Sequence, residues 1–95
     1  MSETLTQFGT SFQSKIITSL LLNNKFIKTV YDILETSYFD ADSNKFLIKE
    51  IKKYFDKYKI PPTMEALKVI IDDLENDTLQ TSVVDSLRKA WNHRE

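Results

Sequence analysis

The chain has 95 residues, with one glycine, two prolines and no cysteine, which suffices for one small domain. Apolar residues make up 41% of it and charged residues 28%, and the formal net charge is -1. This composition excludes a disordered segment, a disulfide framework and a thiolate zinc site, and it gives no overall attraction to nucleic acid or anionic lipid.

From the sequence we expect neither a membrane span nor a signal peptide. The longest apolar runs, such as Leu20-Leu21-Leu22, fall far short of the roughly 20 residues that a membrane helix needs. The N-terminus lacks the basic start and the apolar core of a signal peptide. We therefore expect a cytoplasmic protein that has no membrane partner.

Apolar residues recur at helical spacing along the chain, and no segment alternates as a strand does. The single glycine also disfavours tight hairpin turns, which need residues that accept positive φ. The predicted fold class is therefore all-α, a compact bundle of about five short helices. Residues 1–10 are expected to form a flexible lead-in to a helical domain over residues 11–95. Because the helical pattern continues to the last residues, we expect a fragment of a longer chain.

The first two helices are predicted on either side of Asn23-Asn24, a pair that favours a helix end. Thr10 or Ser11 is in position to cap the first helix. Its apolar stripe consists of Phe12, Ile16 and Leu20, at a spacing of four. The second helix is expected over the apolar residues from Phe26 to Leu34, antiparallel to the first because the link is short.

A loop over residues 36–44 follows, and its Tyr38-Phe39 pair is interpreted as a plug for the end of the core. Asp42 or Ser43 is predicted to cap the third helix. The apolar stripe of that helix consists of Leu47, Ile51, Tyr54, Phe55 and Tyr58. Pro61-Pro62 ends it, because proline lacks an amide hydrogen and disfavours helical geometry in the residue before it.

Thr63 occupies the N-cap position of a fourth predicted helix, which Asn76-Asp77 ends, and Thr78 is expected to cap a fifth. The fourth stripe consists of Leu67, Ile70, Ile71 and Leu74, and the fifth of Leu79, Val83, Leu87 and Trp91. These stripes predict one shared core. Its expected members are Phe12, Ile16, Leu20, Phe26, Val30, Leu34, Leu47, Ile51, Phe55, Leu67, Ile70, Leu74 and Leu87.

The sequence indicates no catalytic, cofactor-binding or metal site. A phosphate-binding loop needs several glycines, because only glycine lets the backbone approach the phosphate closely, and the single glycine lies in the lead-in. The only histidine, His93, has no ligand-type residue one helical turn before it and is interpreted as an exposed end residue. No serine has a histidine base beside it. We expect no cofactor in this segment.

An acidic cluster lies at the end of the fourth predicted helix, with Asp72, Asp73 and Glu75 followed by Asp77. A calcium loop would need a central glycine for its turn, so the favoured interpretation is a solvated face. Negative charge near a helix C-terminus opposes the macrodipole, which makes contact with a basic partner the alternative.

The third predicted helix is basic, because residues 45–59 hold six lysines and two acidic residues, a net charge of +4. Lys45, Lys49, Lys52 and Lys53 are predicted to project away from the apolar stripe as a ridge. A solvated face is the favoured interpretation of this ridge, and a protein partner is the next. Binding to nucleic-acid phosphates is less favoured, because the ridge contains no arginine for bidentate contacts.

Several of these motifs follow one another in an order that resembles the N-terminal domain of DnaB-type replicative helicases, particularly the T-even phage branch. That order is a Tyr-Phe loop, an amphipathic helix with a Phe/Ile-Lys core, a hydrophobic-Pro-Ser/Thr turn and an Ala-Leu helix. The matching segments are Tyr38-Phe39, Lys45-Phe46-Leu47-Ile48-Lys49, Tyr54-Phe55-Asp56-Lys57-Tyr58 and Ile60-Pro61-Pro62-Thr63-Met64-Glu65-Ala66-Leu67. Residues 16–21 and Phe26 are similar to the family's first helix and the turn after it. The resemblance covers residues 14–74.

The resemblance implies a helical domain without catalytic residues of its own, which forms a collar above a hexameric ATPase ring. Its partners are then the other helicase subunits and primase or a loader protein, and DNA is contacted only through the full-length ring. ATP and Mg are expected only in a motor domain further along the chain, and a subunit-pairing helical hairpin is expected before that. A phage-encoded protein of this kind works in the host cytoplasm.

Two other functions fit the residues. A stand-alone helical nucleic-acid binder or regulator is favoured by the lysine ridge and disfavoured by the acidic net charge. An accessory adaptor would bind another helix along an exposed apolar stripe.

Overall fold

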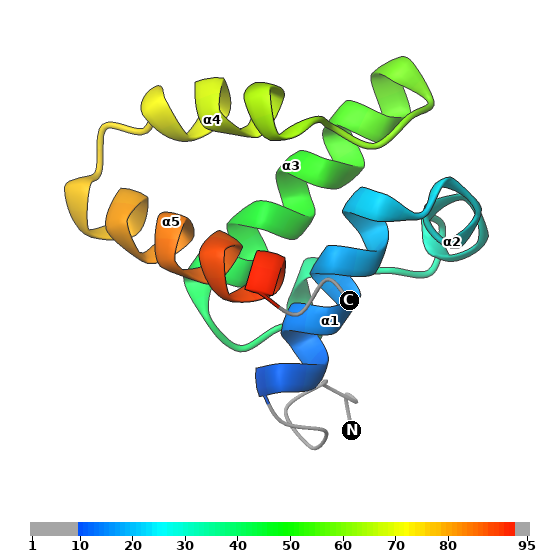
Figure 1. Cartoon of the computed structure of the whole chain (residues 1–95), viewed down its shortest axis with the longest axis horizontal. Helices are drawn as coiled ribbons and strands as arrows, with labels where there is room; N and C mark the ends of the chain where they lie inside the picture. The colour runs from blue at the N-terminus through cyan, green and yellow to red at the C-terminus, as the bar shows by residue number, and fades with distance from the viewer. Residues whose placement is uncertain (1–9, 93–95) are drawn as a thin grey trace.

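The computed structural model describes residues 10–92, which form five α-helices and one short 3₁₀ helix and contain no strand (Figure 1). The elements are α1 (Thr10–Leu22), α2 (Asn24–Val30), the 3₁₀ helix η2 (Thr36–Tyr38), α3 (Asp42–Tyr58), α4 (Met64–Asp72) and α5 (Asp77–Asn92). The predicted all-α class is confirmed. Among the described residues, no helix is both long and apolar enough to cross a membrane. The predicted lead-in, apart from Thr10, and His93 lie outside the described residues.

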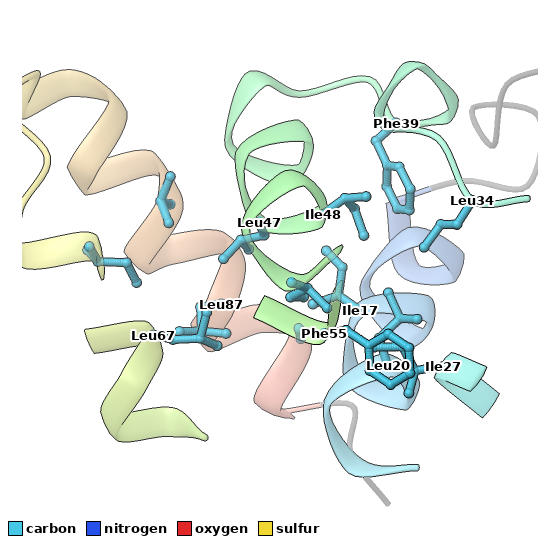
Figure 2. Packing of buried hydrophobic residues seen from close by; sticks show 14 residues of the cluster. Ile17, Leu20, Ile27, Leu34, Phe39, Leu47, Ile48, Phe55, Leu67 and Leu87 are labelled. Carbon is cyan, nitrogen blue, oxygen red and sulfur yellow. The ribbon is translucent and has the colours of Figure 1, made fainter. Parts of the chain in front are cut away.

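Helix α3 is central, and α1, α5 and η2 all pack against it. Its buried side chains cover a wide face. Figure 2 shows Leu47 on the side of α3 where Leu67 and Leu87 lie, while Ile48 and Phe55 lie on the side of α1. A helix that is buried over such a wide face organises the core from the middle.

Helix α1 buries a face that is shifted from the predicted stripe: Leu20 is buried and Ile16 partly buried as predicted, but Phe12 is not. Phe12 is 38% exposed, so its predicted place in the core is wrong. Gln13, Ile17 and Thr18 are buried instead. The polar side chains can be buried because they are hydrogen-bonded: the single proton of the Thr18 hydroxyl is shared between two carbonyl acceptors, that of Ala90 in α5 and that of Ser14 at 3.0 Å.

The Gln13 side chain ties α1 to the loop before α3. Its Nε2 donates to Asp40 Oδ2 at 3.2 Å, and its Oε1 accepts from the Asp40 amide at 3.4 Å. Phe39, next in the chain, is buried, which confirms the predicted aromatic plug of the core, with Tyr38 partly buried beside it.

Helix α2 begins after Asn23 and ends at Val30, four residues earlier than predicted. The Asn23 side chain caps it by accepting from the Phe26 amide at 3.0 Å. The chain then turns, so that Leu34 is buried while Ile33 is exposed. Helical spacing cannot show this early end, because a turn can return the chain to the same core.

Of the N-caps predicted for α3, α4 and α5, two are wrong and one is confirmed. Ala41 precedes α3, and Ser43, a predicted cap, instead shares a 2.6 Å hydrogen bond with Ser86 of α5. Asp42, the other candidate, lies in the first turn, where its charge suits the macrodipole. Thr63 caps α4 as predicted, accepting from the Ala66 amide at 3.1 Å. The cap of α5 is Asn76 rather than Thr78, because the Asn76 Oδ1 accepts from the Leu79 amide at 2.9 Å.

The start of α1 and the end of α3 are set by local geometry. Because α1 begins at Thr10, the predicted caps Thr10 and Ser11 both lie inside its first turn. Lys59 closes α3 in the left-handed conformation, with φ of 63°, and its amide donates to the Phe55 carbonyl at 2.7 Å. The two prolines then lead into α4.

The core matches most of the prediction. Buried as predicted are Leu20, Leu34, Leu47, Ile51, Phe55, Leu67 and Leu87. Partly buried are Ile16, Phe26, Val30, Ile70 and Leu74. The core also buries residues that the predicted core omits, namely Ile17, Ile27, Phe39, Ile48, Ile71, Val83 and Ala90.

Candidate docking surface

The lysines of the predicted ridge do not all face solvent. Lys49 and Lys53 are exposed and Lys45 is partly buried. Lys52 folds back onto the protein: its Nζ donates to the Leu34 carbonyl and lies 5.6 Å from the centre of the Tyr31 ring. The prediction that Lys52 projects outward is therefore wrong, because the turn after α2 offers it an acceptor and an aromatic face.

Tyr31 completes this attachment of the turn to α3. Its hydroxyl donates to Asp56 Oδ1 at 2.9 Å, and its ring centre lies 5.1 Å from that of Phe55. The hydrogen bond to Asp56 raises the pKa of Tyr31 above its usual value, because losing the proton would break the bond and place two negative charges together. Tyr31, Lys52 and Asp56 thus hold the turn and are not free for a partner.

Three other lysines of α3 form an exposed line, which we call the lysine row: Lys49, Lys53 and Lys57. Their spacing of four places them along one side of the helix. Among the described residues, the one salt bridge joins Lys89 to Asp85 at 3.3 Å, so no carboxylate neutralises the lysine row. Lys57 also lies 5.2 Å from the centre of the Tyr58 ring.

A groove of about 400 Å³ lies between α3 and α4, beside the lysine row. Its apolar lining consists of Tyr54, Tyr58, Ala66, Val69 and Ile70, and its polar lining of Glu50, Lys53 and Lys57. Tyr58 is 51% and Val69 is 65% exposed, and the rings of Tyr54 and Tyr58 pack with centres 4.5 Å apart. The groove therefore combines exposed apolar side chains with positive charge.

Sequence reasoning missed both exposed residues of this groove. It placed Tyr58 in the stripe of the third helix, but residues 56–58 at the end of α3 are all exposed. Val69 lies off the inward stripe that buries Leu67 and Ile71. A large apolar residue on the outer face of a short helix was the available signal.

The acidic residues lie at the far end of α4 from this groove's aromatic pair. Asp72 is the last residue of α4, Asp73 is its C-cap and Glu75 lies in the link to α5, and all three are exposed. The structure therefore does not bring them together with the lysines of α3; Figure 1 shows α4 running from the end of α3 to the start of α5. No three acidic or histidine side chains among the described residues are grouped to hold a metal ion.

A second groove, of about 540 Å³, follows the other side of α4 and is lined by Met64, Lys68, Val84 and Leu87, among others. Helix α4 is thus bordered by grooves on both sides.

No known protein family, curated protein or solved structure matches this chain. The resemblance to the helicase domain therefore stays a prediction.

Proposed function

We propose that this chain is the non-catalytic N-terminal assembly and docking domain of a DnaB-type replicative helicase of the T-even phage kind. The observation that carries the proposal is the order of motifs over residues 14–74. Each motif contributes to the fold: Phe39, Leu47 and Phe55 are buried in the core, and Thr63 caps α4. Residues of this kind determine a fold, and their order supports membership of a family built on it.

The docking half of the proposal is supported by the surface around α4. Exposed apolar side chains there, Tyr58 and Val69 foremost, lie beside a row of lysines that has no carboxylate partner among residues 10–92. Such a surface suits a protein partner, because an exposed apolar patch with a charged rim marks interaction sites. Primase or a helicase loader is the partner that the resemblance implies, and ATP and Mg belong to a separate motor domain.

Reading the gene beyond the codon for Glu95 tests the helicase half. A frame that continues into a segment with a glycine-rich phosphate loop ending Gly-Lys-Ser/Thr supports the proposal. A stop codon at once would favour a stand-alone adaptor.

Binding measurements test the docking half. Primase and loader proteins from the same genome, mixed with the chain and with a version extended through the following hairpin, should form a complex on size-exclusion chromatography. Absence of a complex with both versions would contradict docking.

The lysine row also favours a second candidate, a small nucleic-acid-binding regulator. That function predicts retention on single-stranded DNA at low salt, lost in the double variant Lys49→Glu with Lys53→Glu. Retention that is equal for the variant would remove this candidate.

A further inference from the structure

The groove between α3 and α4 is lined by both helices and is long enough to hold a short third helix. Both of its walls are helices, and along α3 its lining runs from Glu50 to Tyr58, or about 12 Å at the helical rise per residue. That length matches two to three turns of a third helix, whose apolar side chains at i, i+3, i+4 and i+7 would lie along the floor. Tyr58 and Val69 stand as exposed walls, and burying them against such a helix is favourable.

The charge around the groove selects the kind of helix. Lys53 and Lys57 line the α3 wall and Lys49 lies one turn before them, all exposed and without a carboxylate partner among the described residues. Glu50 is the one acidic residue in the lining, and it lies at the end of the groove away from Tyr58. Carboxylates of a bound helix would therefore lie beside Lys53 and Lys57.

We infer that this groove binds an amphipathic helix of a partner protein in which aspartate or glutamate flanks the apolar stripe. The inference rests on the docking half of the proposed function and specifies its partner by chemistry. It combines the apolar floor between α3 and α4 with the lysine row on the α3 wall.

A protein helix fits this groove better than nucleic acid does. Ala66, Val69 and Ile70 make the α4 wall aliphatic, so bases can stack only on Tyr54 and Tyr58 of the α3 wall, whereas the apolar stripe of a helix contacts both walls.

The test uses the 95-residue chain and a synthetic helical peptide of about 14 residues, with leucine on its apolar stripe and glutamate on both flanks. We expect the peptide to shift the amide resonances of residues 57–58 and 66–70. The double variant Lys53→Glu with Lys57→Glu should weaken binding by about tenfold, because two attractive pairs become repulsive. The variant Glu50→Gln should tighten binding by removing the one repulsive group in the lining.

Two controls separate charge recognition from misfolding. The variant Lys25→Glu with Lys28→Glu makes the same change of charge at exposed positions of α2 and should leave binding unchanged. A peptide with lysine in place of glutamate should bind the Lys53→Glu, Lys57→Glu variant better than it binds the unaltered chain. This exchange of preference requires a folded groove.

Three results would overturn the inference. One is shifts that lie outside the groove, and another is equal binding of the acidic and the basic peptide. The third is displacement of the acidic peptide either by an oligo(dT) strand or by a second copy of the chain, seen as a dimer that Val69→Asp dissociates.

If primase or the loader binds the unaltered chain and the Lys53→Glu, Lys57→Glu variant alike, the groove assignment fails while the proposed function stands. If the acidic peptide binds as expected but primase and loader do not, the proposed function fails instead.

Discussion

Helix α4 is attached to the molecule differently from helices α1, α3 and α5. The three helices share a wide apolar interface and are also joined by buried or half-buried polar bonds, such as Thr18 to the Ala90 carbonyl and Ser43 to Ser86. Helix α4 buries Leu67 and Ile71, and within residues 10–92 one side-chain hydrogen bond joins it to another helix, from Gln80 of α5 to the Ile71 carbonyl at 2.9 Å.

This difference predicts that the three-helix core is the more rigid part of the molecule and that α4 is the more mobile one. A helix attached through few buried side chains opens locally at a lower free energy than the global unfolding. The same shallow attachment leaves Val69 and its neighbours exposed for a partner. The three-helix core therefore provides the frame, and the edge helix carries the surface that we propose as the docking site.

The largest effect is expected from a cavity in the frame. Ile51 is fully buried in α3, so Ile51→Ala should lower the free energy of unfolding by about 2–5 kcal/mol. Val69→Ala on α4 removes an exposed side chain of nearly the same size and should change stability by about 0.5 kcal/mol or less. Chemical denaturation followed by circular dichroism measures both, and similar losses in the two variants would contradict the division.

A smaller loss is expected from the buried hydroxyl that joins α1 to α5. Thr18→Val keeps the shape but leaves the buried Ala90 carbonyl without this donor, which costs about 1–3 kcal/mol. Thr29→Val is the matched control, because its hydroxyl also bonds the carbonyl four residues earlier, at 2.8 Å, but on the exposed surface of α2. Denaturation curves that place the two variants within error of each other would show that the Thr18 bond adds no stability.

The helices of the frame were predictable because their apolar spacing is regular, as in Leu47, Ile51 and Phe55. The buried face of α1 was not predictable in the same way. Gln13 and Thr18 can be buried because they donate hydrogen bonds to Asp40 and to the Ala90 carbonyl, which are distant in the chain. Apolar spacing alone therefore favoured Phe12, which is exposed. Local sequence cannot indicate a partner that only the tertiary fold supplies.

The candidate site also has features that the sequence predicts and features that only the tertiary fold determines. The positive charge of α3 was evident from composition, and Lys49 and Lys53 do face solvent. The inward turn of Lys52 was not evident, because it depends on where the chain turns after α2. The groove required knowledge of how α4 lies against α3, which the two prolines and the Thr63 cap do not determine.

Removing the N-cap of α4 or of α5 tests whether α4 unfolds separately from the three-helix core. Thr63→Ala should destabilise α4 by about 1 kcal/mol, and because α4 opens separately, its amides alone should exchange faster. Asn76→Ala removes the cap of α5, a frame helix, so its cost should appear in the exchange of the whole frame. Hydrogen exchange resolved by residue measures both. Uniformly faster exchange throughout the molecule in Thr63→Ala would show that α4 unfolds together with the frame.

The smallest effect concerns the turn that Tyr31 ties to α3. Because the pKa of Tyr31 is raised in the folded chain, chiefly by its hydrogen bond to Asp56, the protonated phenol favours folding. This contribution is fully present below about pH 10, the usual tyrosine pKa, and is lost as the pH rises through the raised value. The stability difference between the unaltered chain and Tyr31→Phe should therefore be constant below that range and shrink above it.

Asp56→Asn removes the charge that the phenolate would face, so the Tyr31 ring carbon resonances should titrate at lower pH in this variant than in the unaltered chain. If Asp56→Asn leaves the Tyr31 titration where it was, the carboxylate is not what holds this proton, and the turn is attached to the frame through Lys52 and the Phe55 ring instead.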